Sequence, residues 1–117
     1  MSTHKDLEVW KLSMDLVEII YELTKSFPKE EQYGLKSQMR RSAVSVPSNI
    51  SEGAARKGNK EYIQFLYISL GSLSELETQL LISARLKYCE KNSDAIKLVE
   101  IVRMKLLNFI KYFKTLK

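Results

Sequence analysis

The sequence is poor in the residues that build metal and redox sites. Its 117 residues include one cysteine and one histidine. A single Cys89 excludes an intrachain disulfide, and Cys89 and His4 together are too few soft ligands for a zinc or iron–sulfur site. No apolar run approaches the roughly 20 residues of a membrane span, and the polar start 1–6 does not resemble a signal peptide. We therefore expect a cytoplasmic protein that has no cofactor and does not contact a membrane.

Catalytic groups are equally scarce. A serine or cysteine nucleophile needs a nearby base, usually histidine, and His4 lies in a terminus that we expect to fray. Glu75 and Glu77 are two residues apart and so do not share a helix face. The chain contains no Glu-x-x-His pair, phosphate-binding loop or dinucleotide motif. We predict that the protein is not an enzyme and has no small-molecule substrate; a nuclease would need a metal-binding acid cluster that we cannot locate.

The composition favours a single helical domain over residues 1–117. Two prolines and four glycines are too few for a many-turned β-sandwich, while 44% hydrophobic residues suffice for a core. In four segments, apolar residues recur at alternating spacings of three and four, which predicts amphipathic helices. The first is expected over 7–26 with Asp6 as its N-cap, the second begins near Leu35, the third follows Asn59 as its N-cap, and the fourth begins near Asn92 or Ser93.

These spacings also predict which residues form the core. The expected stripes are Val9, Leu12, Leu16, Ile19 and Leu23; Leu35, Met39, Ser42, Val46 and Ile50; Tyr62, Leu66, Ser69, Leu73, Leu76 and Leu80, widened by Ile63, Leu70 and Leu81; and Val99, Val102, Leu106, Phe109, Phe113 and Leu116. The all-α architecture predicted is an antiparallel up-down-up-down four-helix bundle.

Pro47 interrupts the second segment. Proline removes a backbone donor and clashes with the preceding turn, so the helix either kinks there or stops and restarts. We favour a kink at Pro47. Asn49 and Glu52 have the spacing of a capping box, with Asn49 accepting from a backbone amide and Glu52 reaching back.

The apolar arc of the fourth segment is wider than one face of a bundle needs. Ile96, Leu107 and Ile110 extend it to one side. This width predicts contact with another subunit, although a small bundle can also have a wide stripe. Small residues in the third segment, among them Ser69, Gly71 and Ser72, either let a neighbouring helix approach closely or are merely tolerated.

Charge is segregated along the chain. Residues 1–31 carry four basic and seven acidic side chains, residues 36–57 carry five basic and one acidic, and residues 103–117 carry five basic and no acidic. Such segregation is typical of self-association between unlike patches or of attraction for a polyanion, and the simpler alternative is a solvated surface. The candidate nucleic-acid-binding residues are Lys36, Arg40, Arg41, Arg56, Lys57, Arg103, Lys111 and Lys114. Tyr33, Tyr62, Tyr67 and Tyr112 could stack on bases but are more typical of bundle packing.

The stretch 27–53, FPKEEQYGLKSQMRRSAVSVPSNISEG, is followed by Phe65-Leu66-Tyr67 and by GSLSELETQL at 71–80. Together with DLEVW at 6–10, these motifs resemble the four-helix-bundle proteins encoded by intervening sequences of bacterial 23S ribosomal RNA genes. They are also similar to the accessory bundle protein of diversity-generating retroelements, whose basic surface engages nucleic acid and a reverse transcriptase. The positions that match most closely are Gln38, Arg41, Ser45, Pro47, Asn49, Glu52 and Gly53.

The resemblance implies a left-handed antiparallel bundle that assembles into a ring, typically a pentamer, with an RNA-linked role. Leu70 stands where many members carry arginine, which removes one possible basic contact. The leading hypothesis is a non-enzymatic homo-oligomer that binds RNA or other nucleic acid through the eight candidate residues. The alternative is a protein-interaction adaptor whose basic face meets an acidic protein partner.

Overall fold

All regular structure in the described part of the chain is helical. The computed structural model describes residues 7–91 and 93–116. It contains α1 (Glu8–Thr24), the short 3-10 helix η2 (Lys29–Glu31), α2 (Leu35–Ala54), α3 (Asn59–Arg85) and α4 (Asp94–Thr115). The predicted all-α fold with four long helices is therefore confirmed.

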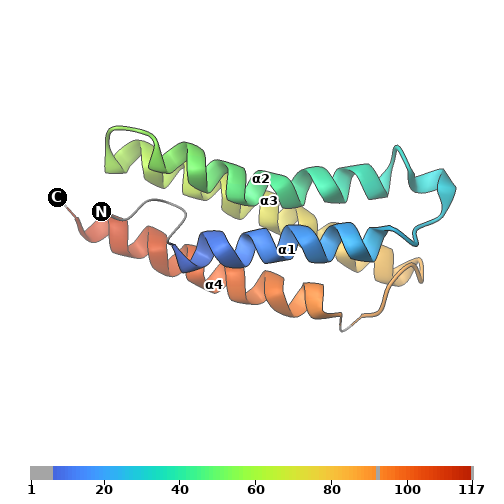
Figure 1. The fold of residues 1–117 in the computed structure, drawn as a ribbon. Coiled ribbons are helices and arrows are strands. Elements are labelled where there is room, and N and C mark those ends of the chain that lie inside the picture. The colour runs from blue at the N-terminus through green and yellow to red at the C-terminus, as the bar shows by residue number, and fades with distance from the viewer. Residues whose placement is uncertain (1–6, 92, 117) are drawn as a thin grey trace.

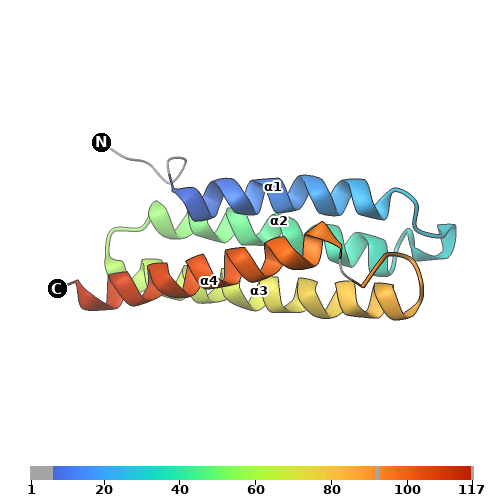
Figure 2. The same cartoon turned by 90° about the horizontal axis from the view of Figure 1, so that it is seen from below.

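The four long helices lie side by side along the long axis of an elongated molecule of 48 × 24 × 21 Å (Figures 1 and 2). Each helix packs against two others: α1 and α3 both contact α2 and α4. The connections α1–α2 and α3–α4 lie at one end of the bundle, and the connection α2–α3 lies at the other, near the C-terminal end of α4. Residues of the first half of α2 are thereby placed far from those of the α2–α3 connection.

The core runs along the middle of the bundle and contains most of the residues that the spacing predicted. Met39, Val46 and Ile50 of α2 are fully buried. Leu66, Leu73, Leu76 and Leu80 of α3, and Val99, Val102 and Leu106 of α4, are fully buried as well. Leu81 and Leu116 are the exceptions, because they are 49% and 41% exposed.

The buried line of α1 differs from the predicted stripe. Val9 and Leu16 are buried as expected, but the line continues through Ser13, Ile20 and Thr24 instead of through the partly buried Leu12, Ile19 and Leu23. Ser13 Oγ donates to the Trp10 carbonyl oxygen at 2.7 Å, and Thr24 Oγ1 donates to that of Ile20 at 2.7 Å. Because a hydroxyl satisfied by its own helix can be buried, counting apolar residues alone misplaces the centre of this face.

The helix ends differ from the expected caps. Asn59 is the first residue of α3 and Gly58 occupies the N-cap position, so the assignment of Asn59 as N-cap was wrong. Helix α4 begins at Asp94, directly after Ser93, which is one of the two positions near which we expected it to start. Asp6, His4 and Asn92 lie outside the described residues.

Helix α2 continues through Pro47 from Leu35 to Ala54, so it does not stop and restart there. The expected capping box does not form. The Asn49 side-chain amide donates to the carbonyl oxygen of Ser45 at 2.9 Å, one turn back, instead of accepting from a backbone amide. Glu52 instead pairs with Arg56 at 2.7 Å. With the helix unbroken, the amides that a cap would satisfy are already bonded within the helix.

Two of the small residues of α3, Ser69 and Ser72, lie where α3 packs closely against α2. Ser69 Oγ donates to the Val46 carbonyl oxygen at 2.8 Å, and the hydroxyls of Ser45 and Ser72 are 2.8 Å apart. A Cβ on Gly53 would lie 2.8 Å from Phe65 Cβ, so this position requires glycine. Gly71 faces open space and takes no part in this packing.

The wide apolar arc of α4 is largely explained within one chain. Ile110 is buried and Ile96 packs against the core, because α4 contacts both α1 and α3 and therefore needs a broad buried face. Leu107, the third residue of that flank, is 46% exposed. It lies with Ile101 and Met104, which are 46% and 62% exposed, around one shallow depression on α4.

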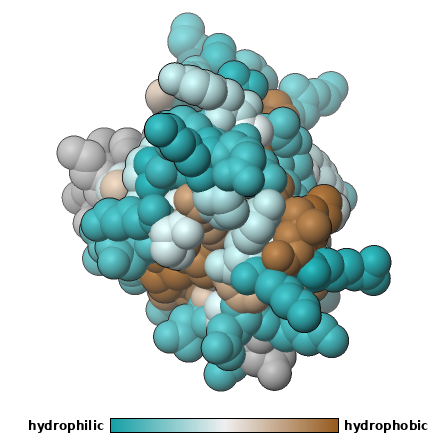
Figure 3. Space-filling model, turned by 90° about the vertical axis from the view of Figure 1, so that its right-hand side faces the viewer, coloured by the Kyte–Doolittle hydropathy of each residue, from teal (hydrophilic) through white to brown (hydrophobic). Residues whose placement is uncertain are grey.

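Further hydrophobic surface is visible at the end of the bundle that carries the α1–α2 and α3–α4 connections, between hydrophilic side chains (Figure 3). Within residues 7–91 and 93–116, no helix is both long and apolar enough to cross a membrane.

Candidate nucleic-acid interface

Three of the eight candidate cations lie together in one groove. Lys36, Arg40 and Arg41 of α2 line an open groove of about 430 Å³ beside the end of α1. The rest of its lining is Tyr21, Gln32, Ser37 and Val44. We call this the α2 groove. Lys36 and Arg40 are one helical turn apart and share a face of α2. Arg41 lies about 100° further round the helix, and it lines the groove as well.

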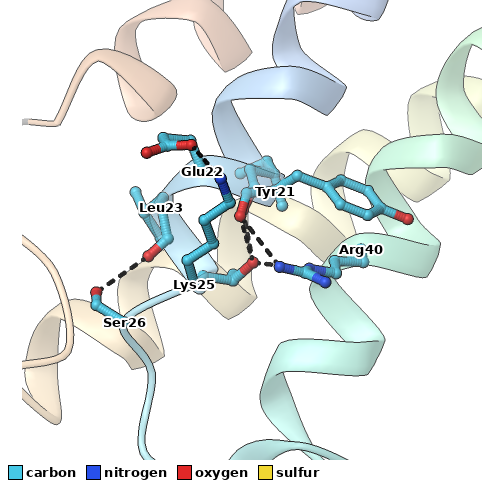
Figure 4. Close-up of polar contacts among 8 residues, drawn as sticks. Tyr21, Glu22, Leu23, Lys25, Ser26 and Arg40 are labelled. Carbon is cyan, nitrogen blue, oxygen red and sulfur yellow. Dashed lines mark hydrogen bonds and ion pairs between the residues drawn. The ribbon is translucent and has the colours of Figure 1, made fainter.

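Arg40 is held in place by the end of α1. Its Nε donates to Thr24 Oγ1 at 2.9 Å, and its Nη2 donates to the Tyr21 carbonyl oxygen at 3.1 Å. The guanidinium also lies over the Tyr21 ring, 4.4 Å from the centroid. Figure 4 shows Arg40 reaching from α2 to Tyr21. All of these partners are neutral, so the side chain is oriented while its charge stays uncompensated.

Lys36 and Arg41 carry free charge as well. Lys36 Nζ donates to the neutral Gln32 Oε1 at 3.2 Å, and Arg41 is exposed on the surface of α2. None of the three groove cations forms an ion pair with a carboxylate of the described residues. Three neighbouring cations without counter-charges, one of them held in place, can bind phosphate groups.

Arg56 and Lys57 lie at the opposite end of the bundle, in the α2–α3 connection. Arg56 pairs with Glu52 at 2.7 Å and with Glu61 at 4.0 Å, and its guanidinium covers the Phe65 ring at 4.9 Å. Its charge is therefore compensated locally. Lys57 is exposed.

The α4 candidates form no single patch. Arg103, in the middle of the helix, donates through Nη2 to Glu77 Oε1 at 2.6 Å and through Nη1 to Glu100 Oε1 at 2.6 Å. Hydrogen bonding from Arg103 lowers the pKa of Glu77, and the pKa of Arg103 is raised in return. Lys111 and Lys114 lie near the C-terminal end, where Lys114 Nζ donates to the Tyr67 hydroxyl at 2.7 Å.

Within one chain the eight cations thus divide between the two ends and the middle of the bundle. The α2 groove combines three uncompensated charges, the α2–α3 end holds Lys57 with Lys111 and Lys114 near by, and Arg56 and Arg103 are neutralised. The pairing of Arg103 with Glu77 could not be predicted from the sequence, because ion pairing between helices depends on which faces meet. The pairing of Arg56 with Glu52, four residues away, could have been predicted from their spacing.

The four tyrosines that could stack on bases differ in how far they are buried. Tyr62 packs against Phe109 and Phe113, with ring centroids 5.6 and 4.6 Å away, and burial raises its pKa to about 12. Tyr67 and Tyr112 are 44% and 57% exposed. Tyr33 is 92% exposed, so it does not contribute to packing in the way expected of these residues.

The remaining groups with possible chemical or binding roles, Cys89 and Trp10, lie in partly buried positions. Burial raises the pKa of the Cys89 thiol, which disfavours the reactive thiolate. Trp10, partly buried on α1, donates through Nε1 to Ser51 Oγ at 3.1 Å. The described residues contain no group of three acidic, histidine or cysteine side chains placed to hold a metal ion.

Comparison with known proteins supports the fold and supplies the family. A solved structure of a protein of unknown function from the S23 ribosomal protein family of Bacteroides thetaiotaomicron VPI-5482 has a TM-score of 0.80 to this chain at 21% sequence identity. The alignment covers 88% of this chain and 95% of that one. No curated protein matches the sequence.

The family model described as 23S rRNA-intervening sequence protein matches residues 5–107. That range includes α1, α2, α3 and most of α4, together with every motif on which the resemblance rested. The chain therefore belongs to the 23S rRNA-intervening sequence protein family.

Proposed function

We propose that this protein is a non-enzymatic, homo-oligomeric four-helix bundle that binds RNA or other nucleic acid electrostatically in the cytoplasm. The observation that carries the proposal is the α2 groove, where Lys36, Arg40 and Arg41 converge without a neutralising carboxylate among the described residues. The family name links such chains to insertions in ribosomal RNA genes, and neither it nor the description of the fold neighbour names an enzymatic activity.

The proposal includes an assembly. Connections that alternate between the two ends of the molecule favour an antiparallel bundle (Figures 1 and 2), with α2 bent at the internal Pro47. We propose that copies of this bundle form a ring, as a pentamer. A ring contains one α2 groove for each subunit. Several weak phosphate contacts can then act on one nucleic-acid molecule, and the overall affinity rises because the sites are held close together. The exposed cations Lys57, Lys111 and Lys114 then provide a second basic zone on each subunit.

The test is a salt titration of binding to RNA and DNA of mixed sequence. Neutralising phosphates releases counterions, so log affinity should fall steeply and linearly with log salt concentration. Lys36→Gln/Arg41→Gln removes two groove charges without touching the contacts of Arg40. For each groove that is engaged, its salt slope should be shallower by about 1.4 for single strands or about 1.8 for duplex, and binding should weaken for all sequences alike.

Arg56→Gln/Lys105→Gln is the matched control. It removes the same charge, but from cations already paired, Arg56 with Glu52 and Lys105 with Glu8. We expect its salt slope to stay close to that of the parent protein. Equal losses in the two double variants would show that net charge, and not the α2 groove, governs binding. A flat or absent signal for the parent protein would favour the adaptor function with an acidic protein partner.

A further inference from the structure

Tyr33 is placed where an aromatic side chain contributes nothing to the stability of the bundle. Its 92% exposure is the highest among the exposed large hydrophobic residues, the next being Met104 at 62%. Tyr88, by comparison, stacks on Phe27 at 5.3 Å and donates its hydroxyl to Glu31 at 3.1 Å. An aromatic ring presented almost entirely to solvent is free to contact a molecule outside the chain.

The backbone that carries Tyr33 is firmly held. Glu31 spans the turn: its carbonyl oxygen accepts from the Gly34 amide at 3.1 Å, and its Oε1 accepts from the Leu35 amide at 3.0 Å. Its other carboxylate oxygen accepts the Tyr88 hydroxyl. The turn between η2 and α2 is therefore fixed to the α3–α4 connection, and the ring of Tyr33 projects from an ordered base.

This turn adjoins the α2 groove. Gln32, the residue before Tyr33, lines the groove, and Lys36 and Ser37 follow one helical turn later. The groove also offers an oriented donor, since Arg40 uses Nε and Nη2 on α1 and leaves Nη1 without a partner among the residues described. An exposed aromatic ring, one residue along the chain from a groove lined by cations, supplies the two elements by which proteins hold unpaired nucleotides, a stacking surface and phosphate contacts.

We propose that Tyr33 and the α2 groove form a binding site for an unpaired nucleotide, with the base stacked on the Tyr33 ring and the adjoining phosphate held by Lys36, Arg41 and Arg40 Nη1. The inference rests on the proposed nucleic-acid binding and narrows it to single-stranded or looped substrates. Stacking requires a base with an uncovered face, and in a duplex both faces are covered by neighbouring base pairs. Phosphate contacts alone would not favour the single-stranded form, because the duplex has the higher charge density.

The experiment compares a single-stranded mixed-sequence RNA with the duplex of the same length, by fluorescence anisotropy at fixed salt. Tyr33→Ala should weaken single-strand binding by about 5- to 100-fold and leave duplex binding and the salt slope unchanged. Tyr33→Phe, which retains the ring, should bind as the parent protein does. Met14→Ala, which removes an exposed apolar side chain from α1, should have no effect.

Each result decides between stated outcomes. Parent protein that binds neither form contradicts the proposed function itself. Parent protein that binds both forms, with Tyr33→Ala unchanged or equally weakened on both, overturns the stacking site and leaves electrostatic binding in place. A lower oligomer mass of Tyr33→Ala in light scattering would assign the ring to a subunit contact and would also overturn the site. An unchanged melting temperature is expected, because the ring makes almost no contacts.

Discussion

The two glycines inside helices differ in how much space surrounds them. Gly53 and Gly71 both lie inside helices, yet only Gly53 faces another helix closely. A methyl group at Gly53 would lie 2.8 Å from both Phe65 Cβ and Tyr62 Cδ1, and backbone movement would be needed to accommodate it. Nothing lies within 4 Å of a Cβ at Gly71. Two identical substitutions should therefore have opposite effects.

Gly53→Ala should lower the free energy of unfolding by about 1–3 kcal/mol, the usual cost of overpacking. Gly71→Ala should raise it by about 0.5–1 kcal/mol, because alanine restricts the unfolded chain and favours helix. Urea denaturation at one fixed protein concentration measures both. Two changes of the same sign would show that helix propensity, and not the α2–α3 distance, controls position 53.

At the scale of the elements, α3 and α4 are joined by an ion pair as well as by the core. The side chains of Glu77 and Arg103 are 29% and 22% exposed, whereas Glu100, which also pairs with Arg103, is 59% exposed. The hydrogen bond from Arg103 holds the pKa of Glu77 below its ordinary value of 4.5. The folded protein thus binds this proton less readily than the unfolded chain does, and stability falls as the pH falls through the folded pKa.

Glu77→Gln should reduce the free energy of unfolding by roughly 1–2 kcal/mol at pH 7. The difference from the parent protein should shrink as the pH falls below the ordinary glutamate pKa of 4.5 and through the lower pKa of folded Glu77, because both proteins then lack the charge. Denaturant titrations between pH 7 and pH 2.5 measure this. Glu100→Gln, at a more exposed site, should cost no more than about 0.5 kcal/mol; a pH-independent loss in Glu77→Gln would contradict the electrostatic explanation.

At the scale of the whole molecule, the proposed assembly requires a surface on which copies of the chain meet. Ile101, Met104 and Leu107 form an apolar row on α4 that one chain leaves exposed. Met104→Glu should lower the mass measured by light scattering to that of a smaller species, because it would bury a charge without a partner. Met104→Leu should keep the assembly. Unchanged mass in Met104→Glu would place the subunit contact on another face.

The sequence predicted more of the helices than of the interface. The alternating spacing in α3 identified Leu66, Leu73, Leu76 and Leu80 correctly, because a regular helix repeats its buried face whatever it packs against. It failed in α1, where Ser13 and Thr24 are buried with their hydroxyls bonded to their own helix. It also gave Arg41 and Arg103 the same expected role, although only Arg103 meets a carboxylate from a neighbouring helix.

The sequence alone was therefore enough to predict the helical class, the approximate helix positions and the family, because periodicity and motifs are properties of residues close together in the chain. Pairing between helices required the tertiary structure. Which cations keep their charge, which tyrosine faces solvent and which glycine is crowded all depend on contacts between residues far apart in the chain, such as Arg40 with Tyr21 and Gly53 with Phe65. Those contacts follow from how the helices are rotated against one another, and a pattern read along a single helix does not contain that rotation.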